Sequence, residues 1–274
     1  MKQSLCTITS NLEIMPGTHL MWVEAPDIAA RAQPGQFVTV KCADFILRRP
    51  LAVHQTGSNN IIAGPARIRT KQSQIALLFR VTGKGTLWLS QRQENEELDI
   101  LGPFGNGFSI PGPSKHLLLV AGGIGIAPLI FLMQHASSRR QVTLIHGVPS
   151  STQLYSQRYL SNDLDYRGIQ FIPVTEDGST GRKGMATQIL PDFLDSADQV
   201  YACGPVEMYK AMTELSLSGN PKLEKCQVSL EVRMGCSFGA CFGCTIDTRN
   251  GLKRVCRDGP VFELGDIIWQ EVNI

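Results

Sequence analysis

Residues 115–137, KHLLLVAGGIGIAPLIFLMQHAS, join a nearly continuous apolar run to a glycine-rich turn and then to apolar residues at helical spacing. The run over 115–123 is typical of a strand buried on both faces, and the residues from 127 onward are typical of a helix packed on a sheet. The same alternation continues, with strands expected over 141–148, 169–177 and 198–205 and helices over 153–164 and 206–215. Strands that alternate with helices predict a parallel, doubly wound sheet.

The residues before this unit follow a different pattern, in which short apolar stretches are separated by turn-forming residues roughly every ten residues. Strands are expected over 19–25, 36–42, 60–68, 75–83 and 98–108, which predicts a small antiparallel β-barrel. The pattern changes at Pro111-Gly112-Pro113. The predicted fold class is therefore α/β plus β, with a barrel domain over 1–111, a doubly wound parallel-sheet domain over 112–222 and a small cysteine-bearing domain over 223–274.

The chain has 274 residues, 43% of them hydrophobic, and a formal net charge of +2. This balance gives no reason to expect binding to nucleic acid or to an anionic membrane surface. The longest uncharged apolar run, 117–133, is short for a membrane span and contains glycines and a proline, and the N-terminus lacks the pattern of a secretory signal. A cytoplasmic protein with reduced cysteines is therefore expected.

Four of the eight cysteines lie in one short segment with the spacing Cys236-x4-Cys241-x2-Cys244-x11-Cys256. Structural zinc sites usually present two close cysteine pairs, whereas C-x4-C-x2-C followed by a distant cysteine is typical of plant-type [2Fe–2S] proteins. The spacing therefore favours these four thiols as ligands of a [2Fe–2S] cluster, with structural zinc as the alternative. The cysteines without ligand spacing are Cys6, Cys42, Cys203 and Cys226.

Small and aromatic residues separate the four thiols. Gly235, Gly239 and Gly243 allow tight turns and let backbone N–H groups approach sulfur. Phe238 and Phe242 fit two interpretations, a shield that keeps water from the cluster or ordinary core packing.

Two glycine-containing turns at strand ends indicate a nucleotide site. Gly122, Gly123 and Gly125 follow a buried strand and open a helix, where free N–H groups and the helix dipole favour a phosphate. A second turn, formed by Cys203, Gly204 and Pro205, follows another strand of the same sheet. Because ligands of doubly wound sheets bind at the carboxyl edge, we expect both turns to contact NAD.

A barrel followed by G-G-x-G-x-x-P and then C-G-P resembles the ferredoxin–NADP reductase family. The resemblance implies that the barrel holds FAD and that Arg49 pairs with its pyrophosphate, because a guanidinium suits two phosphate oxygens. Ala52 stands where that family often has serine or threonine, close to flavin N5. The residues implied to contact FAD are Arg49, Pro50, Leu51, Ala52, Leu78, Phe79, Arg80, Gly85 and Thr86. The alternative for Arg48 and Arg49 is a solvated strand edge.

The C-terminal segment narrows the resemblance. Its pattern E-x-R-M-x-C-x4-C-x2-C followed by V-C-x-D-G-P-V-F, over 231–262, resembles the electron-transfer subunits of class 1B dihydroorotate dehydrogenases, and the likeness covers the whole chain. Ser237 is a departure, because that family commonly has glycine there. Phthalate-type dioxygenase reductases are less similar, because a longer gap precedes their final cysteine.

This resemblance implies one function for the three parts. An FMN-containing dihydroorotate dehydrogenase catalytic subunit would oxidise dihydroorotate in de novo pyrimidine biosynthesis, as the partner in a heterotetramer of two copies of each chain. Single electrons would reach FAD through the [2Fe–2S] cluster, and FAD would deliver a hydride to NAD⁺. Hydride transfer itself requires no protein acid or base, so no catalytic residue is assigned.

Several assignments stay open. His54 is either a proton donor or, as is commoner for a lone histidine in a loop, a solvated residue. Glu176 and Asp177 either bind the NAD ribose or form a polar turn, while Arg182 and Lys183 keep NADP open as the alternative to NAD. The rival functions are a small subunit of another ferredoxin- or hydrogenase-linked NAD(P)H flavin oxidoreductase and a redox-sensing or zinc-bound regulator without turnover.

Overall fold

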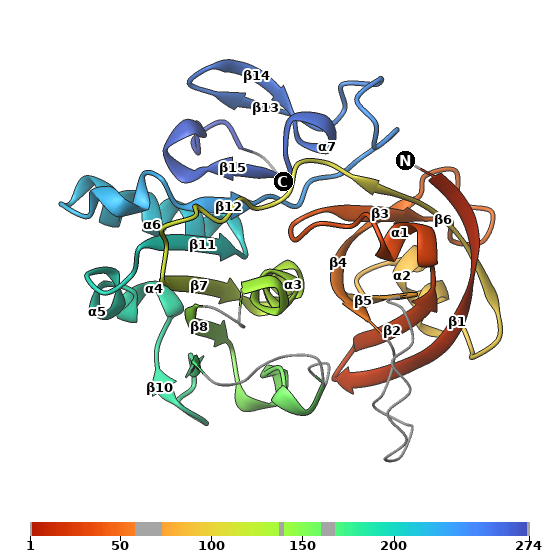
Figure 1. The fold of residues 1–274 in the computed structure, drawn as a ribbon, viewed down its shortest axis with the longest axis horizontal. Coiled ribbons are helices and arrows are strands. Elements are labelled where there is room, and N and C mark those ends of the chain that lie inside the picture. The colour runs from red at the N-terminus through yellow and green to blue at the C-terminus, as the bar shows by residue number, and fades with distance from the viewer. Residues whose placement is uncertain (1, 58–72, 137–139, 160–167, 273–274) are drawn as a thin grey trace.

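The computed structural model describes residues 2–57, 73–136, 140–159 and 168–272, and the strand expected over 60–68 lies outside these residues. The N-terminal part contains β1 (Lys2–Met15), β2 (Thr18–Glu24), β3 (Phe37–Val40), β4 (Arg49–Gly57), β5 (Gln74–Arg80) and β6 (Glu97–Phe104), with the short helices α1 (Pro26–Ala29) and α2 (Lys84–Ser90). These strands close in the order β1-β2-β5-β4-β3-β6, and every pair in the ring is antiparallel (Figure 1). The predicted barrel is confirmed.

Alternation along each strand explains why the barrel closes. In β6, Leu98 and Ile100 are buried, while the intervening Asp99 is half-buried. The inward residues of β6 pack in the barrel core with residues of the other strands, such as Val38 and Val40 of the neighbouring β3. A period of two thus separates an apolar interior from an outer face that carries charged side chains.

The second part is a parallel sheet with one antiparallel edge strand. Its strands are β7 (His116–Gly122), β8 (Gln141–Val148), β9 (Ile169–Thr175), β10 (Arg182–Lys183), β11 (Gln199–Cys203), β12 (Gln227–Ser229) and β15 (Val261–Glu263). They run in the order β10-β9-β8-β7-β11-β12-β15, and only β15 is antiparallel to its neighbour. The predicted doubly wound sheet is confirmed, and its last two strands come from the cysteine-bearing end of the chain.

Helices cover both faces of this sheet. On one face, α3 (Ile126–Ala136) lies between the sheet and the barrel (Figure 1). Leu117 and Leu119 of β7 join α3 in a core that also includes Leu78 of the barrel. On the other face, Leu118 of β7 packs in a core with residues of α4 (Ala186–Ile189), α5 (Pro191–Leu194) and α6 (Val206–Leu217). Because α3 is enclosed on both sides, it is apolar almost all round.

One predicted helix is wrong within the described residues. The segment expected to be helical over 153–164 forms short 3₁₀ turns at Ser151–Gln153 and Gln157–Tyr159, and residues 160–167 lie outside the described part. The side chains of Tyr155 and Tyr159 are buried against the barrel side of the sheet instead. Tertiary packing has therefore overridden local helix propensity here.

The C-terminal residues form a small layer above the barrel and the sheet (Figure 1). The hairpin of β13 (Thr245–Thr248) and β14 (Gly251–Arg254) is followed by α7 (Val255–Asp258). Asn106 fixes this layer to the barrel, because its backbone N–H donates to Gly259 O at 2.6 Å and its side chain donates to Asp258 O at 3.1 Å. In the described part of the chain, no helix has both the length and the apolar character needed to cross a membrane.

Candidate functional site

Cys236, Cys241 and Cys244 lie in a loop before β13, and Cys256 lies in α7; backbone N–H groups donate to the sulfurs of the first three. Cys236 Sγ accepts from Ala240 N at 3.2 Å and from Cys241 N at 3.3 Å, while Cys241 Sγ accepts from Gly243 N at 3.4 Å. In the second half of the segment, Cys256 N donates to Cys244 Sγ at 3.5 Å. The thiols thus form two pairs, each joined by N–H···S bonds.

At Cys236 these bonds favour the thiolate form that binds metal, whereas burial raises the pKa of the Cys256 thiol to about 12. Burial raises the pKa of the Cys236 thiol, but the backbone N–H groups of Cys241, Phe238 and Ala240 outweigh burial and lower that pKa to about 6. Cys244 and Cys256 are 4% and 2% exposed, whereas Cys241 is exposed. In the described residues, no three histidine, cysteine or acidic side chains meet the geometry of a site for one metal ion.

The backbone conformation of this loop accounts for two of its glycines and for Ser237, which stands where the similar family commonly has glycine. Ser237 has φ 66° and Gly239 has φ 90°, both in the left-handed region. Ser237, which replaces a common glycine, therefore adopts the conformation that glycine favours. A Cβ on Gly235 would lie 3.1 Å from Cys241 Sγ, so a side chain there would crowd the ligand sulfur.

Arg254 contacts the cysteine loop at two points. Its guanidinium donates to Gly239 O at 2.7 Å and lies 4.8 Å from the centre of the Phe242 ring. The backbone N–H of Arg254 donates to Asp258 Oδ2 at 2.8 Å. Phe238 and Phe242 are 54% and 61% exposed, so the core-packing interpretation of these two rings is wrong.

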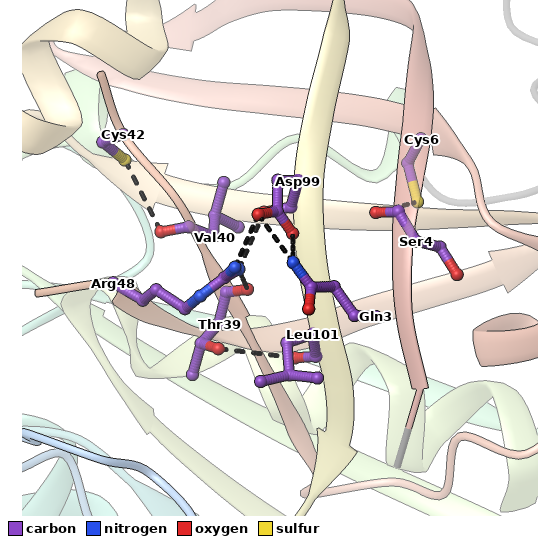
Figure 2. A network of polar contacts seen from close by, with 9 residues as sticks. All are labelled: Gln3, Ser4, Cys6, Thr39, Val40, Cys42, Arg48, Asp99 and Leu101. Atoms are coloured by element: carbon purple, nitrogen blue, oxygen red, sulfur yellow. Dashed lines mark hydrogen bonds and ion pairs between the residues drawn. The ribbon is translucent and has the colours of Figure 1, made fainter. Parts of the chain in front are cut away.

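Two adjacent arginines, Arg48 and Arg49, have separate roles. Arg48 turns towards β6, where it pairs with Asp99 at 2.6 Å and donates to Asp99 O at 3.1 Å, while Gln3 donates to the same carboxylate at 3.0 Å (Figure 2). Arg48 therefore ties the barrel strands together. Arg49 lies over Gly85, where an added Cβ would be 2.4 Å from Arg49 Nε. We call this close approach of the Arg49 guanidinium to the backbone that opens α2 the cradle of Arg49 and Gly85; Arg49 Nη1 also donates to Leu47 O at 2.5 Å.

The other residues expected to contact FAD have different exposures. Pro50, Leu51 and Ala52 are half-buried on β4, beside Arg49. Thr86 Oγ1 accepts from Thr82 N at 3.0 Å and Gly83 N at 3.2 Å, so this hydroxyl stabilises the turn. The remaining three lie on β5, where Leu78 and Phe79 are buried and Arg80 is exposed. The side chains of Leu78 and Phe79 belong to the cores, which leaves their backbone for a ligand.

The two turns expected to bind nucleotide meet at the carboxyl edge of the sheet. A Cβ on Gly125 would lie 2.0 Å from Cys203 O, and one on Gly122 would lie 2.7 Å from Pro205 Cδ. Gly123 differs, because its φ is 53° and the space next to it is open. Gly122 and Gly125 thus permit contact between the two turns, whereas Gly123 supplies a turn whose outer side is free.

His146 is a site residue that none of the sequence motifs indicates. It is fully buried near the end of β8, where Nε2 donates to Gly123 O at 3.0 Å and Nδ1 has no hydrogen-bond partner among the described residues. Burial lowers the pKa of His146 to about 4, so the ring is neutral. Its place at the carboxyl end of a predicted strand was the available signal. The ring fixes the carbonyl of the glycine that faces open space.

His54 corrects an expectation. It lies on β4 and is completely buried, so the solvated-loop interpretation is wrong. The ring contacts Ala127 O at 2.9 Å through Nδ1 and the Tyr155 hydroxyl at 2.9 Å through Nε2. Burial lowers the pKa of His54 to about 4, which makes it a poor proton donor at neutral pH.

The polar residues after β9 form a turn. Asp177 Oδ1 accepts from Ser179 N at 2.9 Å and from the Ser179 hydroxyl at 2.6 Å, and these bonds lower the pKa of Asp177. Arg182 pairs with Asp192 at 2.6 Å. Lys183 is exposed, as is Glu176. The turn interpretation therefore accounts for Asp177, and Arg182 already has an acidic partner.

Comparison with known proteins agrees with this geometry. Residues 231–268 match a family model described as the iron-sulfur cluster binding domain of dihydroorotate dehydrogenase B, and residues 119–214 match the oxidoreductase NAD-binding domain. The chain is 35% identical to a protein of Desulforamulus reducens named "Dihydroorotate dehydrogenase B (NAD(+)), electron transfer subunit", over 94% of this chain and 95% of that protein. A protein of the same name from Geobacillus thermodenitrificans is 34% identical over 96% and 97% of the two chains.

Solved structures show the same architecture. An NADH-dependent reduced ferredoxin-NADP oxidoreductase superposes with a TM-score of 0.78 at 25% identity, covering 97% of this chain and 91% of that one. A ferredoxin NADP⁺ reductase from Neisseria gonorrhoeae superposes with a TM-score of 0.59 at 18% identity, covering 80% of this chain and 92% of that one. The second likeness concerns the fold alone.

Proposed function

The chain belongs to the family of electron-transfer subunits of NAD⁺-dependent dihydroorotate dehydrogenase B, and from this premise we propose which residues hold each cofactor. It is an oxidoreductase subunit that transfers electrons to NAD⁺ in pyrimidine biosynthesis, and its cofactors are FAD, a [2Fe–2S] cluster and NAD. When bound, the cluster passes single electrons, the flavin exchanges one or two, and NAD⁺ accepts a hydride.

Cys236, Cys241, Cys244 and Cys256 hold the cluster. The observation that carries this assignment is the pairing of the four thiols by backbone N–H···S bonds. Such bonds stabilise thiolate charge before and after metal binding, and sulfur donors suit iron. The donor set therefore fits a two-iron cluster.

Iron and acid-labile sulfide analysis of the anaerobically purified holoprotein tests the assignment. Cys241→Ser and Cys244→Ser are expected to lose both components and the visible bands of the cluster. Cys226→Ala is the matched control, because Cys226 is buried but belongs to no thiol pair, and it should keep iron and sulfide. Zinc without sulfide in the unmodified protein would contradict the proposal.

The FAD residues are those that surround the cradle of Arg49 and Gly85. Arg49 contributes a guanidinium to the pyrophosphate, and the backbone at Gly85 and Thr86 lies beside it. Pro50, Leu51 and Ala52 border the isoalloxazine from β4. Leu78 and Phe79 contribute main-chain atoms because their side chains are buried, and Arg80 contributes an exposed side chain. The lack of a hydroxyl at Ala52 leaves hydrogen bonding to flavin N5 to the backbone.

NAD is placed at the carboxyl edge of the sheet. The backbone at Gly122, Gly123 and Gly125 faces the pyrophosphate, and the turn of Cys203, Gly204 and Pro205 contacts the nicotinamide half. Support comes from the meeting of these two turns and from the open space beside Gly123. NAD rather than NADP is the ligand, since Arg182 is already paired with Asp192.

The partner is an FMN-containing catalytic subunit that oxidises dihydroorotate, in a complex of two copies of each chain. The chain works in the cytoplasm, where its thiols stay reduced. Its domains are divided near residues 111 and 222, although β12 and β15 beyond the second boundary complete the sheet. Co-expression with such a subunit should give dihydroorotate-dependent NADH formation. The purified complex should have the mass of two copies of each chain. Absence of both would contradict this partnership.

A further inference from the structure

His54 is a buried ionisable residue that none of the assigned roles uses. It lies two residues after Ala52 on β4, the strand proposed to border the flavin, and its side chain is 0% exposed. Its two nitrogens contact Ala127 O and the Tyr155 hydroxyl, both at 2.9 Å. Both partners belong to the nucleotide-binding half, so the ring joins the two halves of the molecule.

The chemistry of the partners fixes the ring's tautomer. A carbonyl oxygen only accepts hydrogen bonds, so Nδ1 carries the proton that bonds Ala127 O. Nε2 of the neutral ring then accepts the single proton of the Tyr155 hydroxyl, whose oxygen also lies 3.1 Å from Tyr159 O, a carbonyl that can take that proton only in place of Nε2. The ring is thereby held at two points, which fixes its orientation as well as its position.

The Ala127 contact lies next to the nucleotide loop, at the start of α3. Ala127 lies in the first turn of α3, two residues after Gly125, which itself packs against the Cys203 turn. The next two residues of β4 extend the seam. Gln55 donates to Tyr159 O at 3.1 Å, and Thr56 O accepts from Gln134 of α3 at 2.7 Å.

We propose that His54 is a positioning residue for hydride transfer, which sets the register between the flavin strand β4 and the nucleotide loop that opens α3. The inference rests on the proposed cofactor sites. In the half-reaction, one hydride, which is two electrons and one proton, leaves NADH and reaches the oxidised flavin, which gives NAD⁺ and reduced flavin. His54 neither gains nor loses a proton.

Geometry decides the rate of such a transfer. Reacting atoms must lie about 3–3.5 Å apart, and a displacement of about 1 Å costs on the order of 10²-fold in rate. His54 contacts the peptide of Ala127 rather than either expected ligand-binding surface. Its loss should therefore lower the limiting rate of hydride transfer more than it changes the affinity for NADH.

The experiment is stopped-flow reduction of the flavin by NADH in the complete complex with its catalytic partner. His54→Leu, which removes both hydrogen bonds, should lower the limiting rate about tenfold or more, while the NADH concentration for half-maximal rate changes less than about twofold. His54→Asn places an amide N–H near the position of Nδ1 and should recover most of the rate. Tyr155→Phe keeps the aromatic ring and should show a smaller loss.

Hydrogen–deuterium exchange supplies a readout that does not depend on turnover. Amides of β4 and of the first turn of α3 should exchange faster in His54→Leu than in the unmodified complex. His116→Gln is the matched control. That histidine also makes two side-chain hydrogen bonds, to Ser196 O and Thr143 Oγ1 at 2.9 Å each. It lies at the first residue of β7, at the end of the strand away from the nucleotide loop. It should leave the rate of flavin reduction unchanged.

Three outcomes would overturn the inference. One is an unchanged limiting rate in His54→Leu, and the second is a rate loss that matches a loss of bound FAD. The third applies if His54→Leu does not assemble. It is a normal rate of flavin reduction in both His54→Asn and Tyr155→Phe, together with unchanged slow amide exchange in β4 and in the first turn of α3. Failure of the unmodified complex to reduce its flavin with NADH would instead contradict the proposed function.

Discussion

Arg49 and Gly85 act as one unit at the scale of single residues. Because an alanine Cβ at position 85 would lie 2.4 Å from Arg49 Nε, Gly85→Ala should displace the guanidinium without removing it. We expect Gly85→Ala and Arg49→Gln to weaken FAD binding by a similar amount, about 1.5–3 kcal/mol for loss of a charge-assisted hydrogen bond. Titration of the apoprotein with FAD, followed by flavin fluorescence, measures this.

A matched control lies two residues before Gly85. Gly83 has extended backbone, and an added Cβ would meet nothing within 4 Å, so Gly83→Ala should keep normal FAD affinity. If Gly85→Ala and Arg49→Gln also kept the FAD affinity of the unmodified protein, the cradle would not bind the pyrophosphate.

The resemblance singled out Arg49 for the pyrophosphate, with a solvated strand edge as the alternative for both arginines, but the sequence assigned Arg48 no partner. The role of Arg48 depends on Asp99, which is about fifty residues away and meets Arg48 only once the barrel has closed. His54 was misjudged for the same reason, because its burial comes from Ala127 and Tyr155 in the other half of the molecule.

At the scale of elements, the junction between α3 and β11 predicts a contrast between two glycines. A Cβ on Gly125 would lie 2.0 Å from Cys203 O, which is backbone and has no room to move, whereas a Cβ on Gly123 would meet open space. Gly123→Ala should cost about 1–2 kcal/mol for its left-handed backbone. Gly125→Ala should cost more than 3 kcal/mol, roughly the upper end of ordinary point substitutions.

Urea unfolding followed by tryptophan fluorescence provides the comparison. The reverse order of the two losses would contradict the close approach seen between Gly125 and Cys203. NAD affinity adds a second test, because Gly123→Ala places its methyl group on the open side and should weaken nucleotide binding despite its smaller effect on stability.

Elements with a clear apolar pattern were predictable, whereas β1, the longest strand of the described residues, and the short irregular turns were not expected. The run over 117–121 is apolar on both faces, so β7 could be assigned without knowledge of its neighbours. The segment after β8 has the same apolar spacing as a helix, but its two tyrosines are used to cover α3 and contact His54. Local periodicity contains no information about such distant partners.

At the scale of the whole molecule, the cysteine-bearing segment is integrated with the sheet and the barrel and does not form a separate unit. Strands β12 and β15 extend the sheet, and Asn106 bonds to the backbone after Cys256. The motif spacing indicated the ligand set, because four thiols must converge whatever surrounds them. Their placement against the barrel depends on strand pairing between residues that are distant in sequence, which no local pattern encodes.

Acid stability is a property of the whole chain that the buried histidines determine. Burial lowers the pKa of His54 and of His146 to about 4, against about 6.5 for an unfolded histidine. Between these values the unfolded chain binds protons at both rings and the folded chain does not. The free energy of unfolding should therefore fall as the pH drops from about 6.5 to 4, by up to about 3 kcal/mol for each ring. Burial lowers the pKa of His19 and His135 in the same direction.

Urea unfolding of the holoprotein at a series of pH values measures this slope. Carboxylates contribute in a separate window, because hydrogen bonds lower the pKa of Asp198 and Asp177 below their ordinary value of 3.8. His54→Asn replaces one titrating ring with a group that does not titrate, so its slope should be reduced by about half, the share of one of two equally shifted rings. A stability that stays flat between pH 6.5 and 4.5, or an unchanged slope in His54→Asn, would mean that the rings are not held neutral in the folded state.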